Sequence, residues 1–201
     1  MTPPLLSKNT AEAGLLVLVV GPSGAGKDTL LDGARRVLGE DDRFVFARRE
    51  ITRPASAGGE EHTEIDEATF AGREASGGYA LSWRANGLAY GIPVQIAGDL
   101  AFGRTVVLNG SRAIVDQARS RFEVIRVILV DADRHILAQR LEQRGRETAL
   151  EIAARLERAP DLDLTGDDVV VVRNNGTPAD GVSALVAALH CQPTLTDSTD
   201  A

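Results

Sequence analysis

The chain has 201 residues, of which 43% are hydrophobic and 25% charged, so it can bury one sizeable core as a single domain. Its formal net charge of −7 argues against a protein whose main role is to bind a nucleic acid backbone or an anionic membrane surface. The single cysteine, Cys191, excludes an intramolecular disulfide. No apolar run is long enough to span a bilayer and no secretory leader is visible, so a cytoplasmic location is expected.

Apolar runs rich in β-branched residues predict the strands of a parallel sheet, at 15–20, 43–51, 105–110, 124–130 and 168–174. Amphipathic patterns predict the intervening helices, which run from Lys27 to about Gly39 and over 66–76, 111–122, 131–145, 147–159 and 178–190. Strands that alternate with helices imply right-handed crossovers and a three-layer α/β fold. The polar ends are expected to be disordered tails, so that one domain over 14–190 lies between tails at 1–13 and 191–201.

The stretch GPSGAGKDT (21–29) joins the first predicted strand to the first predicted helix, which is the context of a phosphate-binding loop. Its glycines let successive N–H groups point toward one anion, and the helix N-terminus adds a positive dipole end. Lysine occurs only at Lys8 and Lys27 while the other basic residues are arginine, which favours a specific role for Lys27 over a chance Gly-rich turn. The predicted contacts to the phosphates of ATP are Gly21, Pro22, Ser23, Gly24, Ala25, Gly26, Lys27, Asp28 and Thr29.

Asp28 lies where most such loops have a serine or threonine whose hydroxyl binds Mg²⁺. A carboxylate is also a hard oxygen ligand, so Asp28 is a candidate ligand for Mg²⁺, directly or through water. The alternative is that Asp28 only favours the positive helix end, with Thr29 as a local cap. The aspartate that usually ends a later strand and completes the metal site is replaced by Asn109. Metal binding would then depend on Asp28, water and the phosphates of the nucleotide.

Two further segments are ARREITRPASAGGEEHTEIDEATF (47–70) and YALSWRANGLAYGIP (79–93). Together with the loop and RLEQRGRE (140–147), they resemble the guanylate kinase family over about residues 15–190. The resemblance implies a P-loop kinase fold with an acceptor-binding insertion over about 52–92 and an arginine-bearing helical lid over about 140–158. It also implies that Arg53 and Tyr90 hold the phosphate of the acceptor, because a guanidinium fork can grip a phosphate in two places.

The departures from guanylate kinases point to another acceptor. Leu81 matches the position of a glutamate that reads guanine, and a leucine cannot accept hydrogen bonds from a base. The second phosphate-binding arginine of that family falls near Ser56. A closer resemblance, carried by GPSGAGKDT, ITRPASAGGEEH, LSWRANGLAYG, LNGSRA and RLEQRGRE, is to the ribose 1,5-bisphosphate phosphokinases, whose loop also has aspartate after lysine. It implies a base-free acceptor site that includes Leu81, with Arg112 as a further contact.

By the same resemblance, Arg140 and Arg144 of the lid meet the transferring phosphoryl group; they are four residues apart and so share a helix face. The alternative is a solvated, salt-bridged helix pair. Arg48 and Arg49 are each interpreted as part of a solvated strand edge. The resemblance also places part of the adenine pocket after the last predicted strand, so Asn174 or Asn175 is a candidate contact to adenine, although a plain turn is an equal alternative.

The activity that the closer resemblance implies is transfer of the γ-phosphoryl group of ATP to the 1-phosphate of ribose 1,5-bisphosphate, with 5-phosphoribosyl 1-diphosphate and ADP as products. Mg²⁺ is expected as a cofactor, and no nucleic acid or membrane partner is expected. Two alternatives stay open at this point. A guanylate or other nucleoside monophosphate kinase is disfavoured by Leu81. A catalytically inactive guanylate kinase-like binding module is disfavoured by the intact glycines and lysine of the loop.

Overall fold

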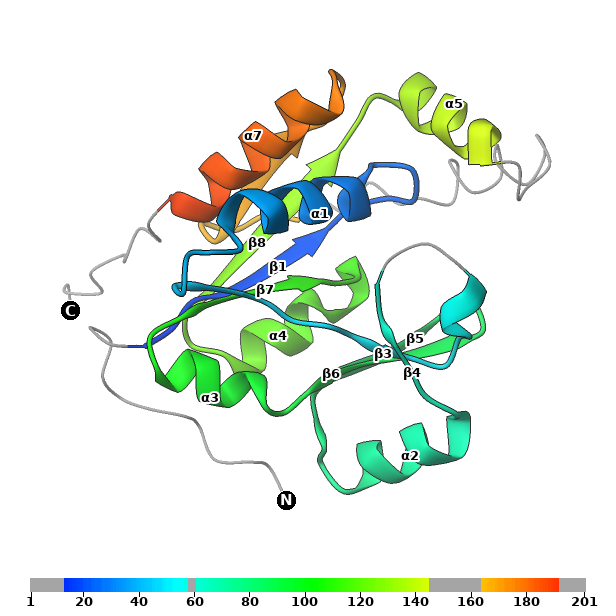
Figure 1. Ribbon diagram of the computed structural model, residues 1–201, viewed down its shortest axis with the longest axis vertical. Helices are drawn as coiled ribbons and strands as arrows, with labels where there is room; N and C mark the ends of the chain where they lie inside the picture. The colour runs from blue at the N-terminus through cyan, green and yellow to red at the C-terminus, as the bar shows by residue number, and fades with distance from the viewer. Residues whose placement is uncertain (1–12, 58–60, 145–163, 192–201) are drawn as a thin grey trace.

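The computed structural model describes residues 13–57, 61–144 and 164–191 (Figure 1). The predicted helix at 147–159, most of both predicted tails and the greater part of the predicted lid lie outside these residues. Within the described part of the chain, no helix is both long and apolar enough to cross a membrane.

The centre of the described fold is a five-stranded sheet in the order β2-β7-β1-β8-β9, and every pairing in it is parallel. Its strands are β1 (Leu16–Val20), β2 (Phe44–Phe46), β7 (Thr105–Asn109), β8 (Ile125–Asp131) and β9 (Val169–Arg173). The predicted α/β fold with a central parallel sheet is thereby confirmed. After β1 the chain runs to the edge strand β2. It then forms β7 on one side of β1 and β8 on the other side, so the direction in which strands are added reverses beside β1. Ligands bind at such reversals, outside the carboxyl ends of the strands.

Helices cover both faces of this sheet (Figure 1). One face carries α1 (Lys27–Leu38) and α7 (Pro178–His190), and the other carries α3 (Ile96–Ala101) and α4 (Val115–Arg121), which follows the short helix η2 (Arg112–Ile114). The alternation of side chains along β1 explains the two cores. Val17 and Val19 pack into the cluster that contains α1 and α7, whereas Leu16 and Leu18 pack into the cluster that contains α4. A further helix, α5 (Arg134–Arg144), follows β8.

A second, four-stranded sheet lies in the segment between β2 and β7 and has the order β4-β3-β6-β5. Its elements are β3 (Glu50–Ile51), β4 (Thr63–Glu64), β5 (Tyr79–Ala85) and β6 (Leu88–Pro93), with the short helix η1 (Ala55–Ala57) and the helix α2 (Glu67–Ala75). The single strand predicted over 43–51 is therefore wrong. The Ala47 N–H still bonds to Val107 of the main sheet, but the Arg49 carbonyl accepts from Thr63 of the second sheet, so the chain crosses between sheets within this run.

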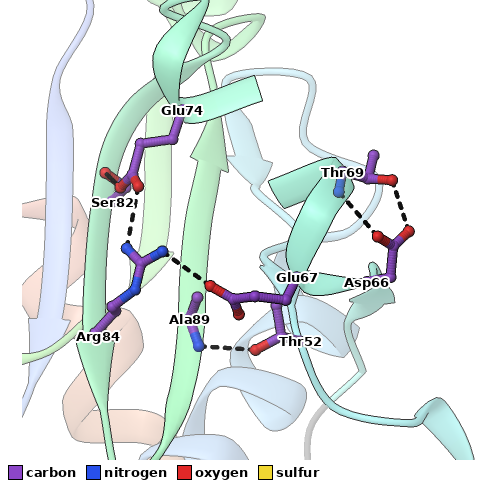
Figure 2. Close-up of polar contacts among 8 residues, drawn as sticks. All are labelled: Thr52, Asp66, Glu67, Thr69, Glu74, Ser82, Arg84 and Ala89. Carbon is purple, nitrogen blue, oxygen red and sulfur yellow. Dashed lines mark hydrogen bonds and ion pairs between the residues drawn. The ribbon is translucent and has the colours of Figure 1, made fainter. Parts of the chain in front are cut away.

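The segment predicted as an acceptor-binding insertion over 52–92 coincides with this second sheet. A polar network on one face of β5 holds α2 in place (Figure 2). Arg84 donates to Glu67 and to Glu74, each at 3.0 Å, and Ser82 donates to Glu74 at 2.8 Å. The hydrogen bond from Ser82 and then that from Arg84 lower the pKa of Glu74. The buried side chains of β5, which include Leu81 and Trp83, lie on its opposite face.

Candidate active site

The phosphate-binding loop follows β1 and its last residues enter α1, as the sequence predicts. Gly24 has φ of +88°, and a Cβ there would lie 3.2 Å from the backbone oxygen of Leu137 in α5. Gly26 is the N-cap of α1 with φ of +89°, and a Cβ there would lie 2.6 Å from Nδ2 of Asn174. Both positions combine a left-handed backbone with a packed neighbour, so only glycine fits them. The result is a closely supported cradle of backbone N–H groups at a helix N-terminus.

Lys27, the first residue of α1, is half-buried. Its Nζ donates to the carbonyl of Gly21 at 2.8 Å and to that of Pro22 at 3.1 Å, so the ammonium lies against the loop itself. This position brings the positive charge to the anion cradle. Of the other predicted loop contacts, Ser23 and Thr29 are exposed and Ala25 is fully buried.

Asp28 faces the carboxyl end of β7. Its Oδ1 accepts a hydrogen bond from Nδ2 of Asn109 at 2.8 Å, and both residues line a cleft between α1 and β7. The cap at Thr29, part of the alternative for Asp28, is wrong, because Gly26 is the N-cap of α1 and no side-chain cap bond is made at that helix end. Asn109 thus occupies the strand end where a metal-binding carboxylate is usual. Its side-chain amide does not supply such a carboxylate but orients that of Asp28.

The described residues contain no group of three or more His, Cys, Asp or Glu side chains that would hold a metal ion alone. Mg²⁺ usually takes one or two carboxylates and completes its shell with water and phosphate oxygens. A single carboxylate, half-buried and oriented by an amide at the head of the phosphate loop, fits that mode of binding. Asp28 is the residue here that would hold the ion.

Asn174 lies beneath the phosphate loop. Its side chain is 4% exposed, and Nδ2 donates to the carbonyl of Ala25 in the phosphate loop at 2.7 Å. Its backbone N–H donates to the carbonyl of Asp131. The next residue, Asn175, accepts from the Asp133 N–H at 2.8 Å. A side chain buried beneath the loop holds the loop backbone, and the expected contact of Asn174 with adenine stays a prediction.

Helix α5 packs on the phosphate loop. The side chain of Leu141 and the backbone of Leu137 lie against Gly24, and Nη1 of Arg140 lies 3.8 Å from the point that a Cβ on Gly26 would occupy. That nitrogen is buried and has no hydrogen-bond partner among the described residues. A buried guanidinium nitrogen beside an anion cradle is suited to a phosphate oxygen. Arg144 ends α5, and its side chain lies outside the described structure.

Arg53 contacts a buried histidine. His62 is 8% exposed; its Nε2 donates to the Arg53 carbonyl at 3.0 Å, and its Nδ1 is 3.4 Å from Nη2 of Arg53. The donor at Nε2 leaves Nδ1 as the acceptor of a neutral imidazole, so this ring holds both the backbone and the guanidinium of Arg53. Nε of Arg53 is buried without a hydrogen-bond partner among the described residues. The sequence contains no local signal for this contact. Arg53 follows β3, whereas His62 precedes β4, nine positions later in the chain.

Tyr90 and Leu81 lie on the hairpin of β5 and β6. Tyr90 stacks on its cross-strand neighbour Trp83, with ring centroids 5.1 Å apart and planes inclined by 5°. Leu81 is fully buried in the core cluster that also contains Trp83 and Ile92. Its placement in the acceptor site is therefore corrected: Leu81 supports the floor of the hairpin and presents no surface to a ligand.

Arg49 is the site residue that the sequence interpretation missed. It is 8% exposed rather than part of a solvated edge, and it lines the same cleft as Asp28 and Asn109. Its neighbour Arg48 is exposed and pairs with Glu61. Arg112 is half-buried at the start of η2, three residues beyond Asn109. The structure thus brings the end of β7, the head of α1 and the segment before β3 around one cleft.

The chain is similar in sequence to proteins named ribose 1,5-bisphosphate phosphokinase PhnN. Over 181 residues the chain is 51% identical to the ribose 1,5-bisphosphate phosphokinase PhnN of Acidiphilium cryptum, which covers 90% of this chain and 95% of the relative. It is 44% identical over 177 residues to the protein of the same name from Brucella melitensis, which covers 88% of this chain and 92% of the relative. The chain belongs to the ribose 1,5-bisphosphate phosphokinase family.

A longer relative and a solved structure are also similar to this chain. A bifunctional ribose 1,5-bisphosphokinase-thymidine phosphorylase from Azorhizobium caulinodans is 47% identical over 180 residues, and the chain spans 26% of its length. No protein-family model matches the chain. The crystal structure of guanylate kinase from Anaplasma phagocytophilum superposes with a TM-score of 0.61 over 92% of this chain and 89% of that one, at 16% identity. The chain therefore has a guanylate kinase-like fold.

Proposed function

We propose that this protein transfers the γ-phosphoryl group of ATP to the 1-phosphate of ribose 1,5-bisphosphate, which yields 5-phosphoribosyl 1-diphosphate and ADP. The observation that carries the proposal is the 44–51% identity to proteins named ribose 1,5-bisphosphate phosphokinase, over 88–90% of this chain. We place the reaction in the cytoplasm, in line with the composition of the chain.

The nucleotide binds in this proposal with its β- and γ-phosphates on the loop and on Lys27. Arg140 lies beside Gly26, where its guanidinium would meet charge on the transferring group. Asp28 would hold Mg²⁺, which would supply further charge neutralisation when bound. Arg144 is proposed as a second lid arginine on the same helix face.

The acceptor binds between α1 and the second sheet. Arg53, held by His62, and the hydroxyl of Tyr90 would hold the 1-phosphate, with Arg112 as a further contact. An oxygen of the 1-phosphate attacks the γ-phosphorus, and the bond from that phosphorus to the β–γ bridging oxygen of ATP breaks. The nucleophile is already an anionic oxygen, so no strong general base is needed and catalysis rests on alignment and charge neutralisation.

The test is steady-state kinetics of ADP formation with ribose 1,5-bisphosphate and with GMP, run in parallel on the purified chain. The bisphosphate is expected to be the better acceptor by a large factor, because a site built for one acceptor discriminates by up to about 10⁴-fold when polar pairing is lost. Arg53→Ala should raise the KM for the bisphosphate much more than the KM for ATP. Turnover of GMP comparable to that of the bisphosphate would contradict the proposal and favour a nucleoside monophosphate kinase.

A further inference from the structure

Arg49 lies where the chain passes from the main sheet to the second sheet. Its side chain borders the cleft that Asp28 and Asn109 also line, and it is 8% exposed. The carbon Cζ of its guanidinium is 5.6 Å from the ring centroid of Trp83 and 5.3 Å from that of Tyr90. A charged group in this position is held by aromatic faces at the wall of the site, and its backbone is fixed by the hydrogen bond from Thr63.

The aromatic pair under Arg49 is itself rigid. Trp83 and Tyr90 are cross-strand partners in β5 and β6, and their rings stack almost in parallel. A planar guanidinium on such a support is pre-organised, so little side-chain entropy is lost when its N–H fork grips an anion in two places. The same guanidinium lies over both aromatic rings.

Other charged side chains lie near the cleft. Arg35 and Arg48 both pair with Glu61, and Arg35 and Glu61 line the cleft together with Arg49. The position near Ser56, where guanylate kinases have their second phosphate-binding arginine, lies in η1 and is exposed. The acceptor of the proposed reaction carries two phosphates, and Arg53 and Tyr90 account for one of them.

We propose that Arg49 binds the second phosphate of the acceptor, the one that is not phosphorylated, and that its stacking on Trp83 and Tyr90 turns a place for a nucleobase into a place for an anion. This inference rests on the proposed function for the identity of the acceptor. It adds a binding and specificity-determining residue whose effect falls on acceptor KM and not on ATP.

The protein contains a single tryptophan, Trp83, so its fluorescence reports directly on the Arg49 site. The experiment measures the KM values for ATP and for ribose 1,5-bisphosphate, and titrates Trp83 fluorescence with the bisphosphate and, separately, with inorganic phosphate. The variants are Arg49→Met and Arg49→Lys. The control is Arg84→Met, because Arg84 also packs on an aromatic ring, that of Phe70, but its side chain lies on the face of β5 opposite to that of Trp83.

Arg49→Met should raise the KM for the bisphosphate about 10- to 100-fold, the range expected when charge-assisted hydrogen bonds are lost, and leave the KM for ATP within about twofold. It should also abolish the response of Trp83 fluorescence to both ligands. Arg49→Lys keeps the charge but not the fork, so it should recover only part of the affinity. Arg49→Lys also serves as the test if the Arg49→Met protein does not fold. Arg84→Met should keep both KM values and the fluorescence response.

The result that overturns the inference is an Arg49→Met protein, or an Arg49→Lys protein in its place, that binds the bisphosphate as the unmodified protein does. An equal rise in both KM values, or an unmodified protein whose Trp83 does not respond to phosphate, overturns it as well. Failure of the proposed function has a different signature. In that case the unmodified protein would not use the bisphosphate, while inorganic phosphate would still change Trp83 fluorescence in an Arg49-dependent manner.

Discussion

Replacement of Asn174 by alanine tests how the phosphate loop is held. Nδ2 of Asn174 donates to the buried carbonyl of Ala25 at 2.7 Å. Asn174→Ala leaves that carbonyl in the protein interior without its partner, which costs about 1–3 kcal/mol. We therefore expect the free energy of unfolding to fall by about 2 kcal/mol. If half of that cost appears as opening of the loop rather than as unfolding, ATP binds several-fold more weakly, since about 1.4 kcal/mol corresponds to a factor of ten.

The assay combines urea unfolding, followed by circular dichroism, with calorimetric titration of ATP and of GTP. Asn175→Ala is the matched control. Asn175 is the next residue, and its side chain accepts from the Asp133 N–H at 2.8 Å, but it is exposed. Water can replace that acceptor, so the control should lose less than about 1 kcal/mol and keep its affinity for ATP.

The reasoning would be refuted by an Asn174→Ala protein with unchanged stability and a reduced preference for ATP over GTP. That result would mean that the side chain reads the base and that the loop is held by other contacts. A loss of stability with an unchanged ratio of ATP to GTP affinity would agree with anchoring of the loop.

Three further predictions concern Lys27, Asp28 and Glu74. Lys27→Ala should abolish phosphoryl transfer without unfolding the protein, and Lys27→Arg should rescue poorly; near-normal turnover of the alanine variant would place the nucleotide site elsewhere. Asp28→Asn should raise the Mg²⁺ concentration needed for half-maximal rate while ATP affinity without metal is kept, and an unchanged Mg²⁺ requirement would limit Asp28 to the helix end. The lowered pKa of Glu74 means that its stabilisation is present above the ordinary carboxyl range and is lost as the pH falls through that lowered pKa. Glu74→Gln should therefore reduce the acid sensitivity of the unfolding free energy, and identical pH profiles would contradict this.

The loop and its helix were predictable because their signals are local. The glycine pattern, Lys27 and the amphipathic run to Leu38 lie within one continuous segment, and the helix observed over Lys27–Leu38 agrees with it. The hairpin of β5 and β6 also had a local signal that the strand assignment overlooked. Asn86 and Gly87, with φ of +51° and +74°, form its two-residue turn, and Asn-Gly is a strong hairpin sequence.

The sites of Arg49, Asn174 and Leu81 could not be predicted in this way. An arginine after a short strand is exposed in most proteins. Only the pairing of β5 with β6 brings Trp83 and Tyr90 together beneath the guanidinium of Arg49. Asn174 reaches Ala25 across 149 positions of sequence. The direction of Leu81 depends on which face of β5 meets the core, which is set by the register of the second sheet.

By itself, the sequence determined the alternation of strands and helices, the identity of the phosphate loop and the family resemblance, because each depends on residues close together in the chain. Tertiary structure alone decided that Asn109 orients Asp28, that His62 holds Arg53 and that Arg49 lines the cleft. Asn109 and Asp28 are 81 positions apart in sequence, and even the nine positions between Arg53 and His62 cross from one strand to another. The geometry of these contacts follows from strand order and register in two sheets, and residue spacing carries no record of either.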